Sequence, residues 1–267
     1  MVKRSVKKAL ILLIGLYIMI GTSLYLLQEK ILFRPTVLAQ DYVYTFDSNF
    51  EELFLKPNDD AVINALHFKA ENPKGVILYF HGNAGDLSRW GIITEYFVGM
   101  NYDVLVMDYR TYGKSTGPLN EAALYQDAQF CYDYLKKQYR DSQITVYGRS
   151  LGTGIASYIT SKNNPKQLIL ETPFYNLEDV AKHRFPIFPL KYAMRYQFAS
   201  HEYIAQTRCP IAIVHGTEDR VVPFLSGKKL FEVAPQAQAT FTVVENGNHN
   251  NLIQFDAYHR MIDTLLR

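Results

Sequence analysis

Six short apolar runs recur along residues 75–245, and each holds only five to seven residues. They are GVILYF (75–80), DVLVMDY (103–109), QITVYG (143–148), QLILE (167–171), IAIVHG (211–216) and ATFTVVE (239–245). Continuous apolar runs of this length are typical of strands buried on both faces of a parallel sheet. Amphipathic segments such as 119–139 and 251–266 lie between or after them. The alternation of strands and helices predicts one doubly wound α/β domain.

Two segments ahead of these runs alternate apolar and polar residues, DYVYTFD (41–47) and AVINALHFKA (61–70). Alternation with a period of two predicts half-buried antiparallel strands at the start of the sheet. The chain is 48% hydrophobic and 20% charged, which is enough apolar material for a sizeable core. The expected fold is therefore mostly parallel, with antiparallel N-terminal strands.

The N-terminal region has a different composition. A basic tail (1–8) precedes an apolar run of 19 residues, ALILLIGLYIMIGTSLYLL (9–27), and a linker follows at 28–40. A helix of that length measures about 28 Å, close to the thickness of a bilayer's hydrocarbon core. No A-x-A pattern follows the run, so we predict an uncleaved signal-anchor helix rather than a cleaved signal peptide or a buried helix. The predicted globular domain is 41–267.

The positive charges ahead of the run also predict an orientation. Four Lys and Arg residues precede it, whereas Glu29, Lys30 and Arg34 nearly balance after it. Lys and Arg concentrate on the cytoplasmic side of a span. We therefore expect a single-pass protein with a cytoplasmic N-terminus and an extracytoplasmic domain.

A long segment, about 172–208, separates the fourth and fifth apolar runs. Pro186 and Pro189 divide it into short pieces, so we predict a small cap over a cleft rather than a single crossover helix. The cap is rich in aromatic and basic side chains: Phe174, Tyr175, Phe185, Phe188, Lys182, Arg184, Lys191 and Arg195. An inert crossover is the alternative.

The stretch VYGRSLGTG (146–154) contains Gly-x-Ser-x-Gly around Ser150. It follows a predicted strand and precedes a run that can form a helix, which is the context in which a serine is held exposed on a strained turn. Side chains at Gly148 and Gly152 would collide in so tight a turn. We predict that Ser150 is a nucleophile rather than a structural turn serine.

A serine needs a base and an acid, and on an α/β-hydrolase sheet the chain order is serine, acid, histidine. His249 lies in the Gly/Asn-rich loop ENGNHNNL, whereas His259 lies inside the last amphipathic segment, so His249 is the predicted base. Asp219 follows the strand IAIVHG and is the predicted acid. Its neighbour Glu218 and the strand-end residue Glu171 are the alternatives.

An oxyanion intermediate requires hydrogen-bond donors. The strand ending ILYF runs into His81-Gly82-Asn83-Ala84-Gly85. The loop after this strand and the residue after the nucleophile supply the amides in such folds, so Asn83 or Ala84 and Leu151 are the predicted donors. His81 and Gly82 are predicted to organise the loop. A phosphate-binding loop is disfavoured because no Lys-Ser/Thr pair follows.

Charge and cysteine content narrow the classes of partner. The net charge of +2 indicates neither nucleic-acid binding nor a polybasic membrane surface. Cys131 and Cys209 show no metal-binding spacing and are predicted to be buried thiols, with a disulfide left open. We expect no metal and no cofactor. The oligomeric state stays open.

Six motifs carry a family resemblance: YFHGNAGDLS, DYRTYGKSTG, VYGRSLGTGIA, ETPFYNLEDVA, CPIAIVHGTEDRVVPF and GNHNNL. They resemble those of the small membrane-anchored α/β-hydrolases of the bud-emergence type, described as serine aminopeptidase-like, whose relatives include thioesterases. The resemblance covers about residues 30–267 and implies the same triad and oxyanion loop. It also implies a structural role for Asp108, Tyr109, Gly113 and Ser115. Thr111 departs from the pattern, since many relatives carry glycine there.

We therefore predict a serine hydrolase that cleaves esters or thioesters through an acyl-enzyme, on a small-molecule, acylated or lipid-like substrate at the membrane. An aminopeptidase needs acidic groups for the free amine, and the cap offers mainly Glu178, Asp179 and Glu202. An amidase or peptidase of the same fold and a non-catalytic binding protein are the alternatives.

Overall fold

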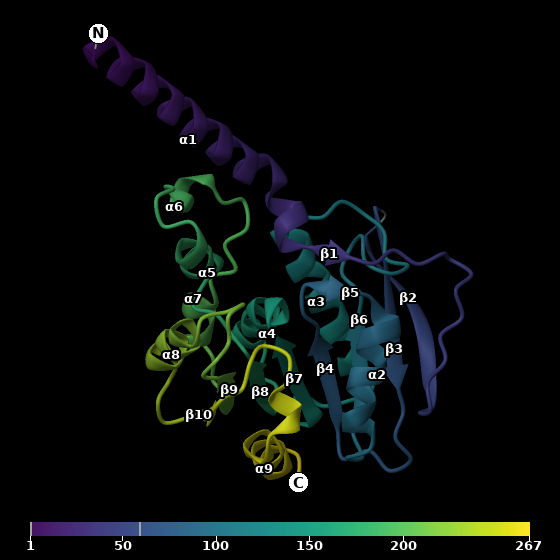
Figure 1. The fold of residues 1–267 in the computed structure, drawn as a ribbon. Coiled ribbons are helices and arrows are strands. Elements are labelled where there is room, and N and C mark those ends of the chain that lie inside the picture. Colours follow the sequence, from purple (N-terminus) through teal and green to yellow (C-terminus); the bar gives the residue numbers. More distant parts are fainter. Residues whose placement is uncertain (1, 59) are drawn as a thin grey trace.

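The computed structural model describes residues 2–58 and 60–267 and is built around an eight-stranded sheet (Figure 1). The strand order is β10-β9-β8-β7-β4-β6-β3-β2. The strands are β2 (Phe50–Asn58), β3 (Ala61–Phe68), β4 (Val76–Phe80), β6 (Asp103–Met107), β7 (Ile144–Arg149), β8 (Gln167–Glu171), β9 (Ile211–Gly216) and β10 (Ala239–Val244). All neighbours are parallel except β2–β3 and β3–β6. The mostly parallel sheet with antiparallel N-terminal strands that the sequence predicts is confirmed.

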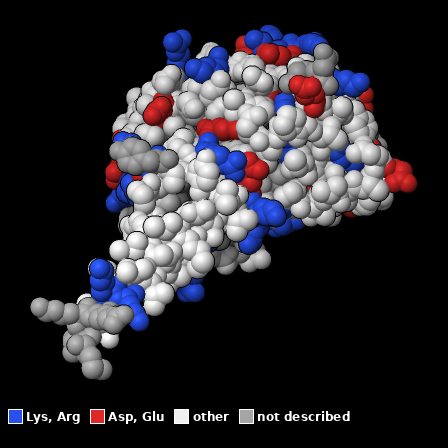
Figure 2. Space-filling view, turned by 90° about the horizontal axis from the view of Figure 1, so that it is seen from above, with Lys and Arg blue, Asp and Glu red and all other residues white. Residues whose placement is uncertain are grey.

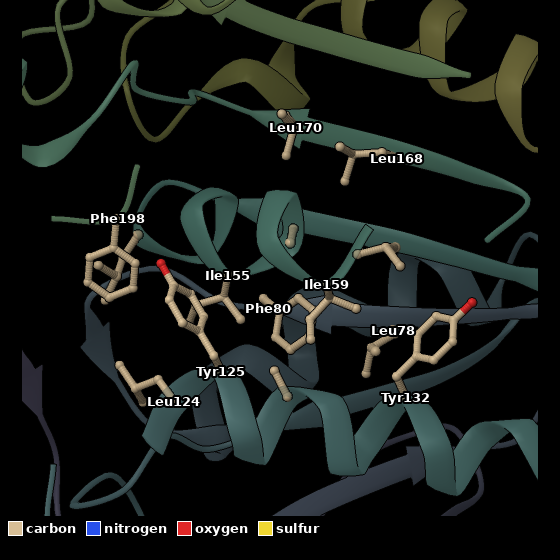
Figure 3. Close-up of a cluster of buried hydrophobic side chains, with 14 of the residues drawn as sticks. Leu78, Phe80, Leu124, Tyr125, Tyr132, Ile155, Ile159, Leu168, Leu170 and Phe198 are labelled. Carbon is tan, nitrogen blue, oxygen red and sulfur yellow. The ribbon is translucent and has the colours of Figure 1, made fainter. Parts of the chain in front are cut away.

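Helices cover both faces of the sheet. They are α2 (Leu87–Val98), α3 (Glu121–Lys136), α4 (Leu151–Lys162), α8 (Phe224–Val233) and α9 (Asp256–Leu265), with 3-10 turns at Asp141–Gln143 and Leu252–Gln254. Side chains of α3, α4 and α8 belong to one buried cluster, and those of α2 and α9 to another. Figure 3 shows the first cluster, where α3 and α4 pack against β4 and β8.

The strand β4 illustrates why the central runs show no alternation of apolar and polar residues. Val76, Leu78 and Phe80 point into the cluster with α3 and α4, whereas Ile77 and Tyr79 point into the cluster with α2 and α9. All five side chains are buried. Because both faces are covered, every position of such a strand is apolar and no alternation remains.

One predicted strand is wrong. Residues 41–47 form an extended segment without strand pairing, although Tyr44 is buried and Phe46 half-buried as the alternation suggested. Both edges of β3 are already occupied, by β2 and β6, so the segment cannot pair with β3. Instead, Tyr44 Oη donates to Asn64 Oδ1 at 2.9 Å, and the Phe46 ring packs on Phe68.

The N-terminal helix α1 (Val2–Leu32) projects from the domain (Figure 1). It is longer than the predicted 9–27, so the predicted linker 28–40 begins as helix. Its segment Ser5–Leu32 is the one helix among the described residues that is long and apolar enough to cross a membrane. Figure 2 shows this projection as an uncharged stem with Lys and Arg near its tip. Beyond it, β1 (Arg34–Pro35) pairs with β5 (Ala84–Gly85).

The segment predicted as a cap holds three short helices, α5 (Leu177–Arg184), α6 (Leu190–Ala193) and α7 (Ser200–Ile204). Asn176 caps α5 by accepting from the Asp179 amide at 2.7 Å. Of the predicted aromatic residues, Phe174 is buried in the core, whereas Phe188 stacks on Tyr17 of α1 with ring centroids 4.8 Å apart. The cap therefore connects the sheet to the N-terminal helix.

The two cysteines are free thiols. Cys131 on α3 and Cys209 before β9 are both buried. Burial raises the pKa of both thiols, to about 11 for Cys209, so they are protonated at neutral pH.

Candidate active site

Ser150 occupies the sharp turn between β7 and α4. Its backbone has φ 52° and ψ −117°, a conformation that costs of the order of 1–3 kcal/mol for a residue with a side chain. A Cβ on Gly148 would lie 2.7 Å from Cβ of Ala156, and one on Gly152 would overlap the Phe80 carbonyl. Both positions therefore require glycine, as the sequence predicted, and the turn presents the serine at the carboxyl edge of the sheet.

Ser150, His249 and Asp219 form a continuous chain of hydrogen bonds. His249 Nε2 lies 2.8 Å from Ser150 Oγ, and its Nδ1 lies 2.7 Å from Asp219 Oδ2. All three side chains are buried, yet each is from a different loop beyond a strand end. With the Nδ1 proton donated to the carboxylate, Nε2 is free to accept the serine proton, which is the arrangement that activates a serine hydroxyl.

The alternative acids and the alternative base lie elsewhere. Glu171 accepts from Tyr147 Oη at 2.6 Å and pairs with Arg149 Nε at 3.2 Å, so its carboxylate is engaged within the sheet. Glu218 is exposed. His259 Nδ1 lies 3.0 Å from Tyr96 Oη, between α9 and α2, and does not contact the serine loop.

Asp219 is held by four nitrogen groups. Its Oδ1 accepts from the amides of Val221 at 2.8 Å and Val222 at 2.9 Å, and Oδ2 faces His215 Nε2 at 3.3 Å as well as His249. Burial alone would raise the pKa of this carboxyl. The hydrogen bonds from His215 and His249 outweigh burial and lower the pKa below its usual range, so the group stays ionised at neutral pH.

The predicted oxyanion loop lies beside the serine. Asn83 and Leu151 line the same cavity as Ser150, whereas Ala84 faces β1 and its carbonyl accepts from Trp90 Nε1 at 2.8 Å. Leu151 is the first residue of α4, where amides have no partner within the helix. Of the two loop residues left open by the sequence, Asn83 is the one that lines the cavity together with the serine.

His81 and Gly82, which the sequence predicts to organise the loop, lie in a closely packed part of the structure. His81 is buried with Nδ1 2.7 Å from the Gly82 carbonyl and Nε2 3.3 Å from Asp108 Oδ1. Tyr109 Oη donates to the His81 carbonyl at 2.7 Å. A Cβ on Gly82 would lie 3.2 Å from the Trp90 ring, so the loop is tightly packed.

Ser150 opens into an apolar cavity of about 210 Å³. Its lining comes from α1 (Leu24, Tyr25, Gln28, Ile31, Leu32), the cap (Phe174, Leu177, Val180, Ala181, Arg184, Phe185, Leu190, Ala193, Met194, Tyr196) and the loop after β9 (Val221, Val222), besides the residues already named. Arg184 is the one charged side chain in this lining. Across residues 2–58 and 60–267, no cluster of three His, Cys, Asp or Glu side chains is arranged to hold a metal ion.

Comparisons with known proteins agree with this architecture. The family model "Serine aminopeptidase, S33" matches residues 71–199. The lysophosphatidylserine lipase ABHD12 of Danio rerio is 29% identical over 94% of this chain and 77% of its own length. The uncharacterised protein R595 of Acanthamoeba polyphaga mimivirus is 32% identical over 78% of each chain. The chain belongs to the serine aminopeptidase-like α/β-hydrolases. The predicted resemblance is confirmed, and the protein is a serine hydrolase.

Solved structures show the same fold at lower identity. The esterase Pf2001 of Pyrococcus furiosus superimposes on this hydrolase with a TM-score of 0.70 at 15% identity, covering 88% of this chain and 96% of the esterase. Similarity at that identity concerns the fold alone.

Two features of this hydrolase's site were not predicted from its sequence. His215 lies on β9 four residues before Asp219, and its Nε2 also lies 3.1 Å from the Val222 carbonyl. Both neighbours of Nε2 are acceptors, so Nε2 carries the proton. The i, i+4 spacing of His215 and Asp219 was the available signal. The contribution of α1 to the cavity has no local signal, because it depends on contacts with a cap more than 140 residues further along.

Proposed function

We propose that this serine hydrolase cleaves an ester or thioester of a lipid-like substrate, with Ser150 as nucleophile, His249 as base and Asp219 as the orienting acid. The observation that carries the proposal is the hydrogen-bond chain of 2.8 and 2.7 Å between the three side chains. His249 accepts the hydroxyl proton while Ser150 Oγ attacks the acyl carbonyl, and then gives the proton to the departing alcohol or thiol.

The second half of the reaction returns the enzyme to its starting state. A water attacks the acyl-serine ester and gives a proton to His249, the fatty acid departs, and Ser150 regains its proton. We assign the amides of Asn83 and Leu151 as donors to the negatively charged carbonyl oxygen in both halves. A single donor of this kind contributes about 10²–10³-fold to turnover in related chemistry.

The cavity supports a substrate with an acyl chain. Its lining is apolar except for Arg184, Gln28, Asn83 and a few hydroxyl groups, so a hydrocarbon chain is favoured over a peptide. A relative is a lysophosphatidylserine lipase, and Arg184 offers a cation for a headgroup phosphate. We therefore favour a phospholipid with one acyl chain as the substrate class.

Aminopeptidase activity has little support in the cap. Glu178 pairs with Lys182 at 2.6 Å, and Asp179 pairs with Lys229 at 2.6 Å. Glu202 is exposed, and none of the three carboxylates lines the cavity around Ser150. The substrate's free amine would therefore have no acidic partner near the serine.

We also propose that α1 anchors the protein with its N-terminus cytoplasmic and the catalytic domain on the opposite side. The support is the basic tail before an apolar helix long enough to span a bilayer. Protease added to intact cells should digest a C-terminal tag and spare an N-terminal one. The reverse pattern would overturn the proposed orientation and leave the proposed role of α1 as an anchor unaffected.

The proposed catalysis is tested with the full chain in detergent micelles. A fluorophosphonate should label the wild type covalently and leave Ser150→Ala unlabelled, and the wild type should release fatty acid from a monoacyl phospholipid. Preference for amide or peptide substrates would instead identify an amidase or peptidase. A folded wild type that neither labels nor hydrolyses any of them would indicate a binding protein.

A further inference from the structure

The last turns of α1 form one wall of the cavity that holds Ser150. Leu24, Gln28 and Ile31 are spaced as one stripe of the helix, with Tyr25 and Leu32 beside it, and all five line the cavity. Leu24 and Leu32 are half-buried there. A helix that served only as a tether would leave the site's wall to the globular domain.

Polar contacts fix this wall against the cap. Gln28 Nε2 donates to the Ala193 carbonyl at 3.2 Å, and Gln28 Oε1 accepts from the Arg195 amide at 2.7 Å. Glu29 accepts from Tyr196 Oη at 3.0 Å and pairs with Arg195 Nη1 at 3.2 Å. These contacts fix the C-terminal turns of α1 in one position relative to the cap.

The C-terminal end of α1 and the residues that follow it are hydrogen-bonded to the loop beside the nucleophile. Asn83 Nδ2 donates to the Leu32 carbonyl at 3.1 Å, and the Arg34 amide donates to the Asn83 carbonyl at 2.9 Å. Tyr112 Oη donates to the same carbonyl at 2.7 Å. The wall formed by α1 is thus hydrogen-bonded to Asn83, which lines the cavity together with Ser150.

The contact between α1 and the cap continues toward the middle of the apolar run. Tyr17 stacks on Phe188 and donates from its hydroxyl to the Ile187 carbonyl at 3.0 Å. The Ile187 side chain itself is 71% exposed, on the outside of the cap. At about 1.5 Å per residue, Tyr17 lies about 10 Å further along the helix than Leu24. If α1 spans a bilayer, these aromatic and aliphatic side chains lie among lipid chains rather than in water.

We infer that α1 is part of the substrate site as well as an anchor, and that it forms, with the cap, the binding wall for the acyl chain of a membrane lipid. The chain enters along the contact between α1 and the cap, and the ester carbonyl reaches Ser150 at the inner end. This inference rests on the proposed lipid hydrolysis for the identity of the occupant. It assigns acyl-chain selectivity to Leu24 and its neighbours on α1.

The first test compares two substitutions on one helix. Leu24→Trp places a bulky ring in the cavity wall, whereas Leu26→Trp makes the same change at a side chain that is 65% exposed and outside the cavity lining. We expect Leu24→Trp to lower the ratio of kcat/KM for palmitoyl over butyryl esters at least tenfold, with butyryl turnover retained. Leu26→Trp should match the wild type. An unchanged ratio in Leu24→Trp would overturn the inference and leave the proposed hydrolysis intact.

The second test needs no turnover. A monoacyl phospholipid with a diazirine in its chain is photolysed with the Ser150→Ala protein in phosphatidylcholine vesicles, and the crosslinked peptides are identified by mass spectrometry. We expect adducts in the α1 peptide that carries Leu24–Leu32, reduced in Leu24→Trp and unchanged in Leu26→Trp. Equal crosslinking in both variants would reject the α1 wall. The expected crosslinking pattern, combined with a wild type that hydrolyses no ester or thioester, would reject the proposed function and support the wall.

Discussion

Asp219 accepts hydrogen bonds from two backbone amides and from His249, with His215 facing the same oxygen. Replacing Asp219 by Asn removes the charge that balances a protonated His249 and favours the wrong tautomer of that ring. We expect Asp219→Asn to lower kcat by about 10⁴-fold, the size seen for the equivalent change in a well-studied serine protease. The measurement is steady-state hydrolysis of a chromogenic ester.

Glu171→Gln is the matched control, because this carboxylate pairs with Arg149 and Tyr147 and does not reach His249. It should lower thermal stability and leave kcat within a few-fold of the wild type. If Asp219→Asn is active and Glu171→Gln is not, the acid has been assigned to the wrong strand end.

Thr111 adopts φ 74°, in the left-handed region, at an exposed position of the loop after β6. A side chain costs about 1–2 kcal/mol in that region, more than the roughly 0.5–1 kcal/mol that glycine loses in backbone entropy. Thr111→Gly should therefore stabilise the protein by about 0.5–1 kcal/mol. Thr111→Ala is the control, since its Cβ retains the strain. A lower thermal midpoint for Thr111→Gly than for Thr111→Ala would contradict this account.

At the scale of elements, the sequence predicts strands best where both faces are covered. The apolar runs at the centres of β4, β6 and β8 are only three to five residues long, which favours strands because helices are usually longer. Alternation is ambiguous, because an extended segment lying over the sheet buries every second side chain as an edge strand does. Residues 41–47 were therefore wrongly predicted as a strand, and the true edge strand β2, with Glu51, Glu52 and Lys56, was missed.

The candidate site was easier to predict than this edge. In a parallel sheet, loops after the strands share one edge, so Ser150, Asp219 and His249 needed only the correct chain order to be proposed together. No comparable rule predicts from the sequence where α1 lies relative to the site. Its register depends on Gln28, Glu29 and the cap, which meet only in the folded protein.

The helix α5 brings Arg184 into the cavity lining while its neighbour Lys182 pairs with Glu178 outside it. If the substrate carries a phosphate, Arg184→Gln should raise KM several-fold for a monoacyl phospholipid and leave KM for a neutral monoacylglycerol unchanged. Lys182→Gln removes one positive charge from the same helix and should change neither. Equal losses in the two variants would indicate general attraction by the cap's charge instead of a specific headgroup contact.

At the scale of the whole molecule, His67 couples folding to pH. It is fully buried on β3, with Lys69 Nζ 2.9 Å from its Nε2. Burial first, and then the Lys69 charge, lower its pKa to about 4, against the opposing effect of Asp103. The unfolded chain, with a pKa near 6.5, therefore binds more protons than the folded one between about pH 4 and 6.5.

Neutral His67 therefore makes a contribution to the free energy of unfolding that is complete above about pH 6.5 and is lost as the pH falls toward 4. Its size is of the order of 3 kcal/mol. His67→Gln keeps an acceptor for Lys69 but cannot titrate, so thermal midpoints of this variant should fall less between pH 6.5 and 4.5 than those of the wild type. His183→Gln, at an exposed position of α5, should follow the wild type. The variant differs from the wild type only in lacking the buried imidazole of His67. Parallel pH profiles for the two proteins would therefore show that acid destabilisation originates in other groups.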